Sequence, residues 1–339
     1  MSSRPRGSSC WRPTTTGSRS SPLPRLPRSL GRCEPWRHRS PLGSVCRHRR
    51  PRVAGERPGV TRRDPRPIGV FDSGVGGLTV LSELRSRLPA EATIYLGDNA
   101  RTPYGPRTAD EVRTFTTECV RWLLGEDVKL LVLACNTATA QALPQVRELS
   151  GVPVVGVVRP GAVAAAAATR SRHVGVIATA GTVASGAYPS AIAEADDRVL
   201  TVQQACPDLV PLVEAGELSG EPVRGALRGY LGELIGRDAQ IDTILLGCTH
   251  YPLLRPLIEG IAGADIAVVD SAFTTALAVE DLLDALGTRA PDSPSGDERP
   301  LAAAHRIVTT GDVGAFSLVA SRIFGASLPD IEAVSLPAL

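Results

Sequence analysis

Hydrophobic and polar positions divide the chain into two parts with different patterns. Residues 1–66 show neither the 3.6-residue apolar period of a helix nor the alternation of a strand, and proline recurs throughout them. From Pro67 onward, short runs of Val, Ile and Leu alternate with amphipathic stretches. Continuous apolar strands followed by helices predict parallel sheets that are covered on both faces, which is the α/β class.

The same pattern locates the individual elements. Strands are predicted at 68–71, 93–96, 130–134, 154–158, 174–178, 199–202, 243–246, 266–269 and 306–309. Helices are predicted between them, and the helix at 108–124 begins with a capping box formed by Thr108 and Glu111. No uninterrupted apolar run approaches the roughly 18 to 20 residues that a membrane-spanning helix needs, so we do not expect a membrane protein.

Two internal similarities indicate that the body of the chain consists of two related halves. Residues 129–148 resemble residues 242–260, because each has an apolar strand, a small residue, a cysteine, a threonine and then a helix. Residues 67–80 likewise resemble residues 173–183, where a strand ends in a loop of small residues. Each offset is about the length of one α/β domain. We therefore predict two similar doubly wound parallel-sheet domains.

Charge is distributed unevenly along the chain. The whole sequence has 37 Lys and Arg against 35 Asp and Glu, a formal net charge of +2. Residues 1–66 hold 17 Arg and three acids, a balance of +14, which leaves 20 basic and 32 acidic side chains, a balance of −12, in the remainder. We expect residues 1–66 to be a disordered extension. A wrongly assigned start in a GC-rich gene, a transit segment and a basic arm that binds nucleic-acid phosphates remain open as explanations.

Seven cysteines are too sparse for a disulfide scaffold, and we expect a reducing, cytoplasmic compartment.

Cys135 and Cys248 each follow an apolar strand and precede a helix. Open α/β sheets bind ligands at such strand ends, and a helix amino terminus lowers the pKa of a thiol. Their matched positions favour a functional pair, whereas Cys119 and Cys206 fit buried structural cysteines. Cys248 and His250 provide two metal ligands at most, so no metal site is predicted.

Two thiols outside a Cys-x-x-Cys motif are suited to acid–base chemistry. Inverting a tetrahedral carbon by proton transfer requires one group that removes a proton from one face and another that delivers a proton to the opposite face. The usual cofactor for this chemistry is pyridoxal bound to a lysine. Lys129 is the only lysine, and at about 3.3 Å per residue it lies about 20 Å from Cys135 along the same strand. We therefore predict a reaction without a cofactor.

Polar side chains near the strand ends are suited to a zwitterionic ligand. The loop 71–77 joins a strand to a helix, where N–H groups favour a carboxylate, and it lacks the P-loop and dinucleotide motifs. Asp72 can bind an ammonium, assist a thiol or cap the helix. His250 can shift the ionisation of Cys248 or be a buried structural histidine, and Tyr104 packs on its own turn or lines the cleft. Further hydroxyls and amides are those of Ser73, Asn136, Thr137, Thr179, Thr182 and Thr249.

Five blocks, DSGVGG, GDNARTPYG, ACNTATA, CPDLVPLVEAG and GCTHYPLL, occur in order between about Pro67 and the carboxyl end. Together they resemble the cofactor-independent aspartate/glutamate racemase superfamily and, within it, the glutamate racemases. The resemblance implies interconversion of L- and D-glutamate, which supplies D-glutamate for bacterial peptidoglycan. It also implies domains at 67–160 plus 275–339 and at 161–274, with the active site in the cleft between them, because the family's chain crosses over and returns.

The resemblance also implies a role for each motif residue. Cys135 would work on the D-enantiomer and Cys248 on the L-enantiomer, assisted by Asp72, Glu214 and His250. Substrate contacts would fall on Asp72, Ser73, Tyr104, Gly105, Asn136, Thr137, Thr249 and His250. Members of the family are commonly homodimers. Arg159 departs from the acidic residue found in many members, which we interpret as variation at the domain crossover.

Two other functions remain open. An aspartate racemase would use the same carbon chemistry with a different pocket for the side-chain carboxylate, although the PYG and GCTHYPLL blocks favour glutamate. A nucleic-acid-binding regulatory relative would use the basic extension and would sense glutamate in the cleft. Paired thiols favour catalysis, because a sensor needs neither of them.

Overall fold

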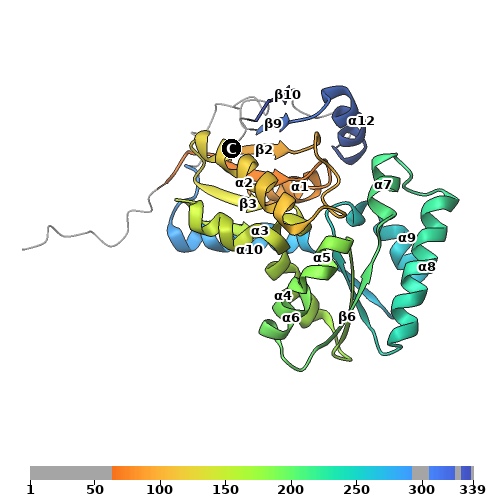
Figure 1. Ribbon diagram of the computed structural model, residues 1–339. Helices are drawn as coiled ribbons and strands as arrows, with labels where there is room; N and C mark the ends of the chain where they lie inside the picture. The colour runs from red at the N-terminus through yellow and green to blue at the C-terminus, as the bar shows by residue number, and fades with distance from the viewer. Residues whose placement is uncertain (1–62, 292–304, 325–329, 337–339) are drawn as a thin grey trace, which may run out of the picture. The chain divides into compact units, whose positions relative to one another are not determined.

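The structure, a computed structural model, describes residues 63–291, 305–324 and 330–336 (Figure 1). All of these residues belong to one compact unit, Pro58–Leu339. The predicted extension lies outside the described residues apart from its last four positions. Within those four, the Asp64 N–H donates to the Arg289 carbonyl and the Arg66 guanidinium contacts Asp127. Residues 63–66 therefore include contacts with the folded body.

The described strands form two parallel sheets. The larger sheet has the order β10-β9-β2-β1-β3-β4, and the smaller has the order β6-β5-β7-β8. The strands of the larger sheet are β1 (Ile68–Asp72), β2 (Thr93–Gly97), β3 (Leu130–Leu133), β4 (Val154–Gly156), β9 (His305–Thr309) and β10 (Ile331–Ala333). Those of the smaller sheet are β5 (His173–Ala178), β6 (Leu200–Ala205), β7 (Thr243–Gly247) and β8 (Ala267–Asp270). The order β2-β1-β3-β4 recurs as β6-β5-β7-β8, which explains the internal similarities in the sequence.

Helices pack on both faces of each sheet (Figure 1). On the larger sheet, one face carries α1 (Leu78–Arg87), α10 (Ser271–Leu286) and α12 (Val313–Phe324), and the other carries α2 (Ala109–Gly125) and α3 (Asn136–Leu149). On the smaller sheet, one face carries α4 (Val158–Ala168) and α6 (Ala187–Ala195), and the other carries α7 (Leu209–Glu214), α8 (Glu221–Arg237) and α9 (Arg255–Ala262). The short α5 (Ala180–Ser185) follows β5. The predicted α/β class with parallel sheets is therefore confirmed.

Every predicted strand is present, and the Thr108 capping box is formed at the start of α2. Some details of the prediction were wrong. The strand predicted at 154–158 ends at Gly156, and α4 begins at Val158, with Pro160 in its first turn, where the missing N–H has no intrahelical partner to lose. The short β10 was not predicted, because three residues that pair on one side only leave little apolar pattern.

The chain passes between the two sheets twice. It leaves the larger sheet after β4 and returns through α10, which follows β8 and packs its apolar face on the core of the larger sheet. The predicted domain boundaries at 160/161 and 274/275 fall inside α4 and α10. The division into two domains at these positions stays a prediction.

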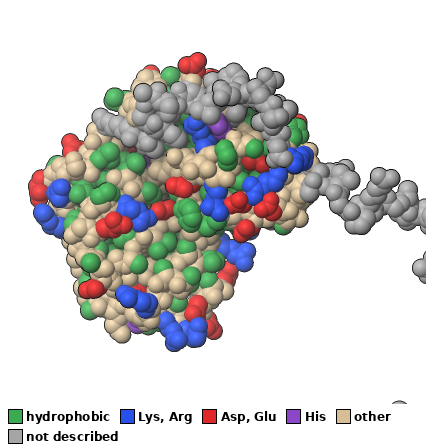
Figure 2. All heavy atoms as spheres, turned by 180° about the vertical axis from the view of Figure 1, so that it is seen from behind, with side chains coloured by type: hydrophobic (Ala, Val, Ile, Leu, Met, Phe, Trp, Pro, Cys, Tyr) green, Lys and Arg blue, Asp and Glu red, His purple; other side chains and the backbone are tan. Residues whose placement is uncertain are grey.

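The described surface carries charges of both signs. Figure 2 shows acidic and basic side chains next to one another on the face that it displays. Among the described residues, no helix combines the length and the apolar character that crossing a bilayer requires.

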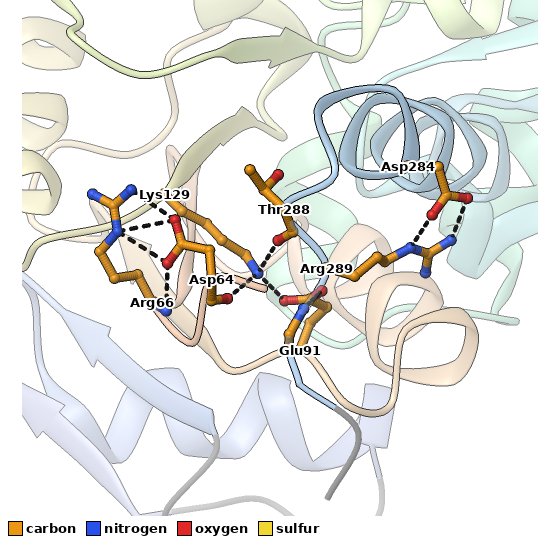
Figure 3. A network of polar contacts seen from close by, with 8 residues as sticks. Asp64, Arg66, Glu91, Lys129, Asp284, Thr288 and Arg289 are labelled. Atoms are coloured by element: carbon orange, nitrogen blue, oxygen red, sulfur yellow. Dashed lines mark hydrogen bonds and ion pairs between the residues drawn. The ribbon is translucent and has the colours of Figure 1, made fainter. Parts of the chain in front are cut away.

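A buried lysine ties together three segments at the amino-terminal edge of the larger sheet (Figure 3). Lys129 Nζ forms an ion pair with Glu91 and donates to the carbonyls of Asp64 and Thr288, both at 2.8 Å. Glu91 in turn accepts the N–H of Ala290 at 2.8 Å. The amine is therefore engaged at the opposite end of β3 from Cys135.

Candidate active site

A cavity of about 110 Å³ lies where the segments after β1, β2, β3, β5, β6 and β7 meet. The carboxyl ends of parallel strands next to a change in strand order are the usual place for a ligand in an open α/β sheet. The predicted site residues that line the cavity are Ser73, Tyr104, Gly105, Cys135, Asn136, Thr137, Cys248, Thr249 and His250. Asp72 and Glu214 are not part of the lining, but each contacts a residue that is.

Cys135 links the end of β3 to the start of α3. It is the N-cap residue of α3, and its Sγ accepts the Ala138 N–H at 3.4 Å and donates to Ser73 Oγ at 3.2 Å. Burial, together with the nearby Asp72 carboxylate, raises the pKa of the Cys135 thiol to about 12. The expectation that the helix terminus lowers this pKa was therefore wrong, because the two hydrogen bonds do not offset the loss of water around a buried thiolate.

Cys248 follows β7 but does not start an α-helix. A 3₁₀ turn at Tyr251–Leu254 separates it from α9, so the prediction that it occupies a helix amino terminus was wrong. Its local partner is a histidine: Cys248 Sγ lies 3.8 Å from His250 Nδ1, and His250 Nε2 lies 2.7 Å from Glu214 Oε1. Burial alone would lower the pKa of His250, but the contacts with Cys248 and Glu214 raise it well above its usual value. His250 is thus a buried histidine in direct contact with a thiol.

Asp72 ends β1 directly behind the cavity. Its carboxylate accepts the Gly74 N–H at 3.0 Å and the Thr249 hydroxyl at 3.4 Å. Burial raises its pKa, and the charge of His250 opposes that shift. The N-cap position of α1 belongs to Gly77, so Asp72 does not occupy it.

The loop after β1 packs closely on the turn that carries the second thiol. A Cβ atom at Gly76 would lie 2.4 Å from Thr249 Oγ1 and 2.5 Å from His250 Nδ1, so only glycine fits there. Thr79 Oγ1 also donates to the Thr249 carbonyl at 3.2 Å. The loop after β1 and the turn after β7, which belong to different pairs of similar segments, are therefore in direct contact.

The remaining predicted contacts form the wall of the cavity. Tyr104 donates its hydroxyl to the buried Asp98 carboxylate and also lines the cavity, so it both packs on its turn and faces the site. The Gly105 carbonyl accepts the Gly181 N–H at 2.9 Å. Thr137 Oγ1 lies 2.9 Å from Thr179 Oγ1.

Not every side chain in or beside the cavity was identified as a site residue from the sequence. Cys206, expected to be structural, is buried in the core of the smaller sheet and also lines the cavity. It directly follows β6, so the strand-end position that singled out Cys135 and Cys248 could have identified it as well. Tyr188, whose hydroxyl accepts the amide N–H of the cavity residue Asn136, lies in the first turn of α6 and gave no such signal.

Other candidates from the sequence lie away from the cavity. Cys119 is buried in α2, as expected, and Arg159 is exposed in the first turn of α4. Within the described ranges, no cluster of three or more His, Cys, Asp or Glu side chains is placed to hold a metal ion.

The model of the Asp/Glu/Hydantoin racemase family matches residues 68–279. The chain belongs to this racemase family. A relative in the family, the glutamate racemase of Shouchella clausii, is 46% identical over 256 residues, which cover 76% of this chain and 89% of that protein. The glutamate racemase of Beutenbergia cavernae is 47% identical over 271 residues, which cover 78% of this chain and 92% of that protein.

Solved racemase structures share the fold. Glutamate racemase isoform RacE1 from Bacillus anthracis is 40% identical, with a TM-score of 0.74, and the match covers 81% of this chain and 99% of that chain. Glutamate racemase from Francisella tularensis in complex with D-glutamate is 32% identical, with a TM-score of 0.73, and the match covers 81% and 100% of the two chains. The resemblance inferred from the five sequence blocks is confirmed.

Proposed function

We propose that this chain is a glutamate racemase that interconverts L- and D-glutamate through two cysteines. The observation that carries the proposal is the pair Cys135 and Cys248. They follow corresponding strands of two repeated sheets and line one cavity. The close relatives that cover most of the chain are glutamate racemases.

The two thiols have different partners, which suits them to opposite roles in one turnover. A thiolate at Cys248 takes the α-proton of L-glutamate, and the electron pair of the C–H bond stays on the α-carbon. Cys135 then gives its proton to the opposite face and keeps the electron pair of the S–H bond as a thiolate. The reverse reaction starts from that thiolate and D-glutamate.

The surroundings of each sulfur support this assignment. The raised pKa of Cys135 keeps it a proton-carrying thiol at neutral pH, donating to Ser73. His250 can take up the thiol proton of Cys248, because its pKa is raised and the Glu214 carboxylate stabilises the resulting imidazolium. Asp72 assists from behind through Thr249.

Glutamate would be held by the groups of the cavity wall. The N–H groups of the loop 73–77 at the start of α1 suit a carboxylate. Hydroxyls and amides of Ser73, Tyr104, Gly105, Asn136, Thr137 and Thr249 surround the remaining polar atoms. A cavity of about 110 Å³ suits a free amino acid more than a drug-sized or nucleotide ligand, whose pockets are about 300–1,000 Å³.

The product and the assembly follow from the family. D-glutamate would supply peptidoglycan synthesis in the cytoplasm, and the chain would act as a homodimer. The regulatory alternative depends on a nucleic-acid-binding arm in residues 1–66, of which 1–62 lie outside the described residues.

The test is racemisation in D₂O without added cofactor. The circular dichroism of either pure enantiomer of glutamate should decay to zero while deuterium enters the α-position. Cys135→Ala and Cys248→Ala should each abolish the decay, whereas Cys119→Ala, which changes a buried thiol outside the cavity lining, should retain it. Full activity in either of the first two variants would exclude the two-thiol mechanism. Faster decay with aspartate than with glutamate would assign the aspartate racemase alternative instead.

A further inference from the structure

Tyr188 contacts the surroundings of both thiols. It lies in α6 on the smaller sheet and is fully buried. Its hydroxyl accepts the Asn136 amide N–H at 2.7 Å, and Asn136 directly follows Cys135. Its ring covers Gly247, the residue before Cys248, so closely that a Cβ atom there would lie 2.9 Å from Tyr188 Cε2.

The Tyr188 hydroxyl also reaches the segment that returns to the larger sheet. The side chain of Ser271, the first residue of α10, is close enough to this hydroxyl to lower its pKa. The ring therefore belongs to one half of the molecule, while the hydroxyl contacts α3 and α10, which pack on the core of the other half.

The contact with Asn136 leaves one polar atom available. The Asn136 amide nitrogen is engaged by Tyr188, whereas its Oδ1 is buried and has no partner among the described residues. Asn136 lines the cavity, and an unpaired buried acceptor is costly to keep. A ligand N–H that reaches Oδ1 would relieve that cost. The orientation of this amide therefore matters for ligand binding as well as for the placement of the neighbouring Cys135.

We propose that Tyr188 is a positioning residue that sets the placement of Cys135 relative to Cys248 by holding Asn136 on one side and packing on Gly247 on the other. The proposal rests on the two-thiol racemisation proposed above. Two-base proton transfer needs both sulfurs to be placed correctly on opposite faces of one α-carbon at the same time. A reaction that needs one base depends on the placement of one sulfur only.

A one-base reaction is available as an internal comparison. In a β-chloro analogue of glutamate, a thiolate takes the α-proton, the C–H electron pair forms the Cα–Cβ double bond, and chloride leaves with the electron pair of the C–Cl bond. The resulting enamine hydrolyses to a keto acid and ammonia, both of which can be measured. Neither step requires a proton from the second thiol.

The test compares the two reactions in Tyr188→Phe, using the full chain. We expect kcat/KM for racemisation to fall about tenfold or more, because small misplacements of reacting groups have large effects on rate, while chloride elimination changes by less than about threefold. Tyr230→Phe is the matched control: it also removes a tyrosine hydroxyl bond, to Asp208, but lies outside the cavity lining, and both reactions should keep their rates.

A second variant tests the same prediction in case Tyr188→Phe misfolds. Ser271→Ala removes the other polar side chain beside the Tyr188 hydroxyl and should lower racemisation more than elimination, in the same direction as Tyr188→Phe. Equal losses in both reactions, or unchanged racemisation in both variants, would overturn the role of Tyr188. A wild-type protein that eliminates chloride but racemises neither enantiomer of glutamate would instead overturn the proposed function.

Discussion

Acidification should destabilise this fold through one buried histidine. His305, at the start of β9, is 2% exposed, and its Nδ1 lies 2.9 Å from Thr93 Oγ1. Burial and the nearby positive charge of Arg85 lower its pKa from 6.5 to about 4. The unfolded chain therefore binds this proton more readily than the folded chain does. The stability that the neutral imidazole contributes is complete above pH 6.5 and is lost as the pH falls toward 4.

The size of the effect follows from the same values. A pKa of about 4 in place of 6.5 corresponds to about 3 kcal/mol for complete titration, and partial screening by water reduces the expected loss at pH 4.5 to about 1–3 kcal/mol. Urea unfolding followed by circular dichroism at pH 7 and pH 4.5 measures it, with His305→Asn as the reference. Every other titratable group is the same in both proteins, so the difference between them isolates His305. An identical loss of stability in wild type and variant would refute the reasoning.

Three further changes give separate outcomes. Glu214→Gln removes the charge that supports protonated His250, so the alkaline limb of the pH–rate profile should move to lower pH and the rate at pH 8 should fall about tenfold; an unchanged profile would contradict this. Lys129→Met leaves the Glu91 carboxylate buried without its ion pair and should lower the free energy of unfolding by about 3–5 kcal/mol, with racemisation by the folded protein unaffected. Thr108→Ala removes the capping box of α2 and should cost about 1 kcal/mol in the same unfolding experiment, whereas no change would show that the cap is dispensable.

Most of the strands could be predicted from the sequence because they are buried on both faces over most of their length. β1, β2, β3 and β7 are buried at every position, which produces the uninterrupted apolar runs that the prediction uses. Where a strand is exposed, the pattern fades. β6 was expected to end at Val202 but continues through Gln203 and Gln204, because it is an edge strand whose polar residues still pair with β5.

The site could be located from the sequence but its electrostatics could not. Strand ends and repeated motifs place Cys135 and Cys248 near each other without any knowledge of packing. The direction of the pKa shift at Cys135 depends on how many atoms surround the sulfur, which only the assembled fold determines. Tyr188 contacts Asn136 from α6, a helix that packs on the smaller sheet, so no sequence spacing connects the two residues.

The single lysine gives this protein its own reporter of local opening. Its amine is enclosed where the segment before β1, the turn before β2 and the end of α10 meet, so a reagent that modifies primary amines reaches it only after those segments separate. The rate at which Lys129 is modified under native conditions therefore measures the opening of the amino-terminal edge of the larger sheet. Because the cavity lies at the other edge, comparing that rate with and without glutamate would reveal whether ligand binding tightens the whole sheet or only the end that it touches.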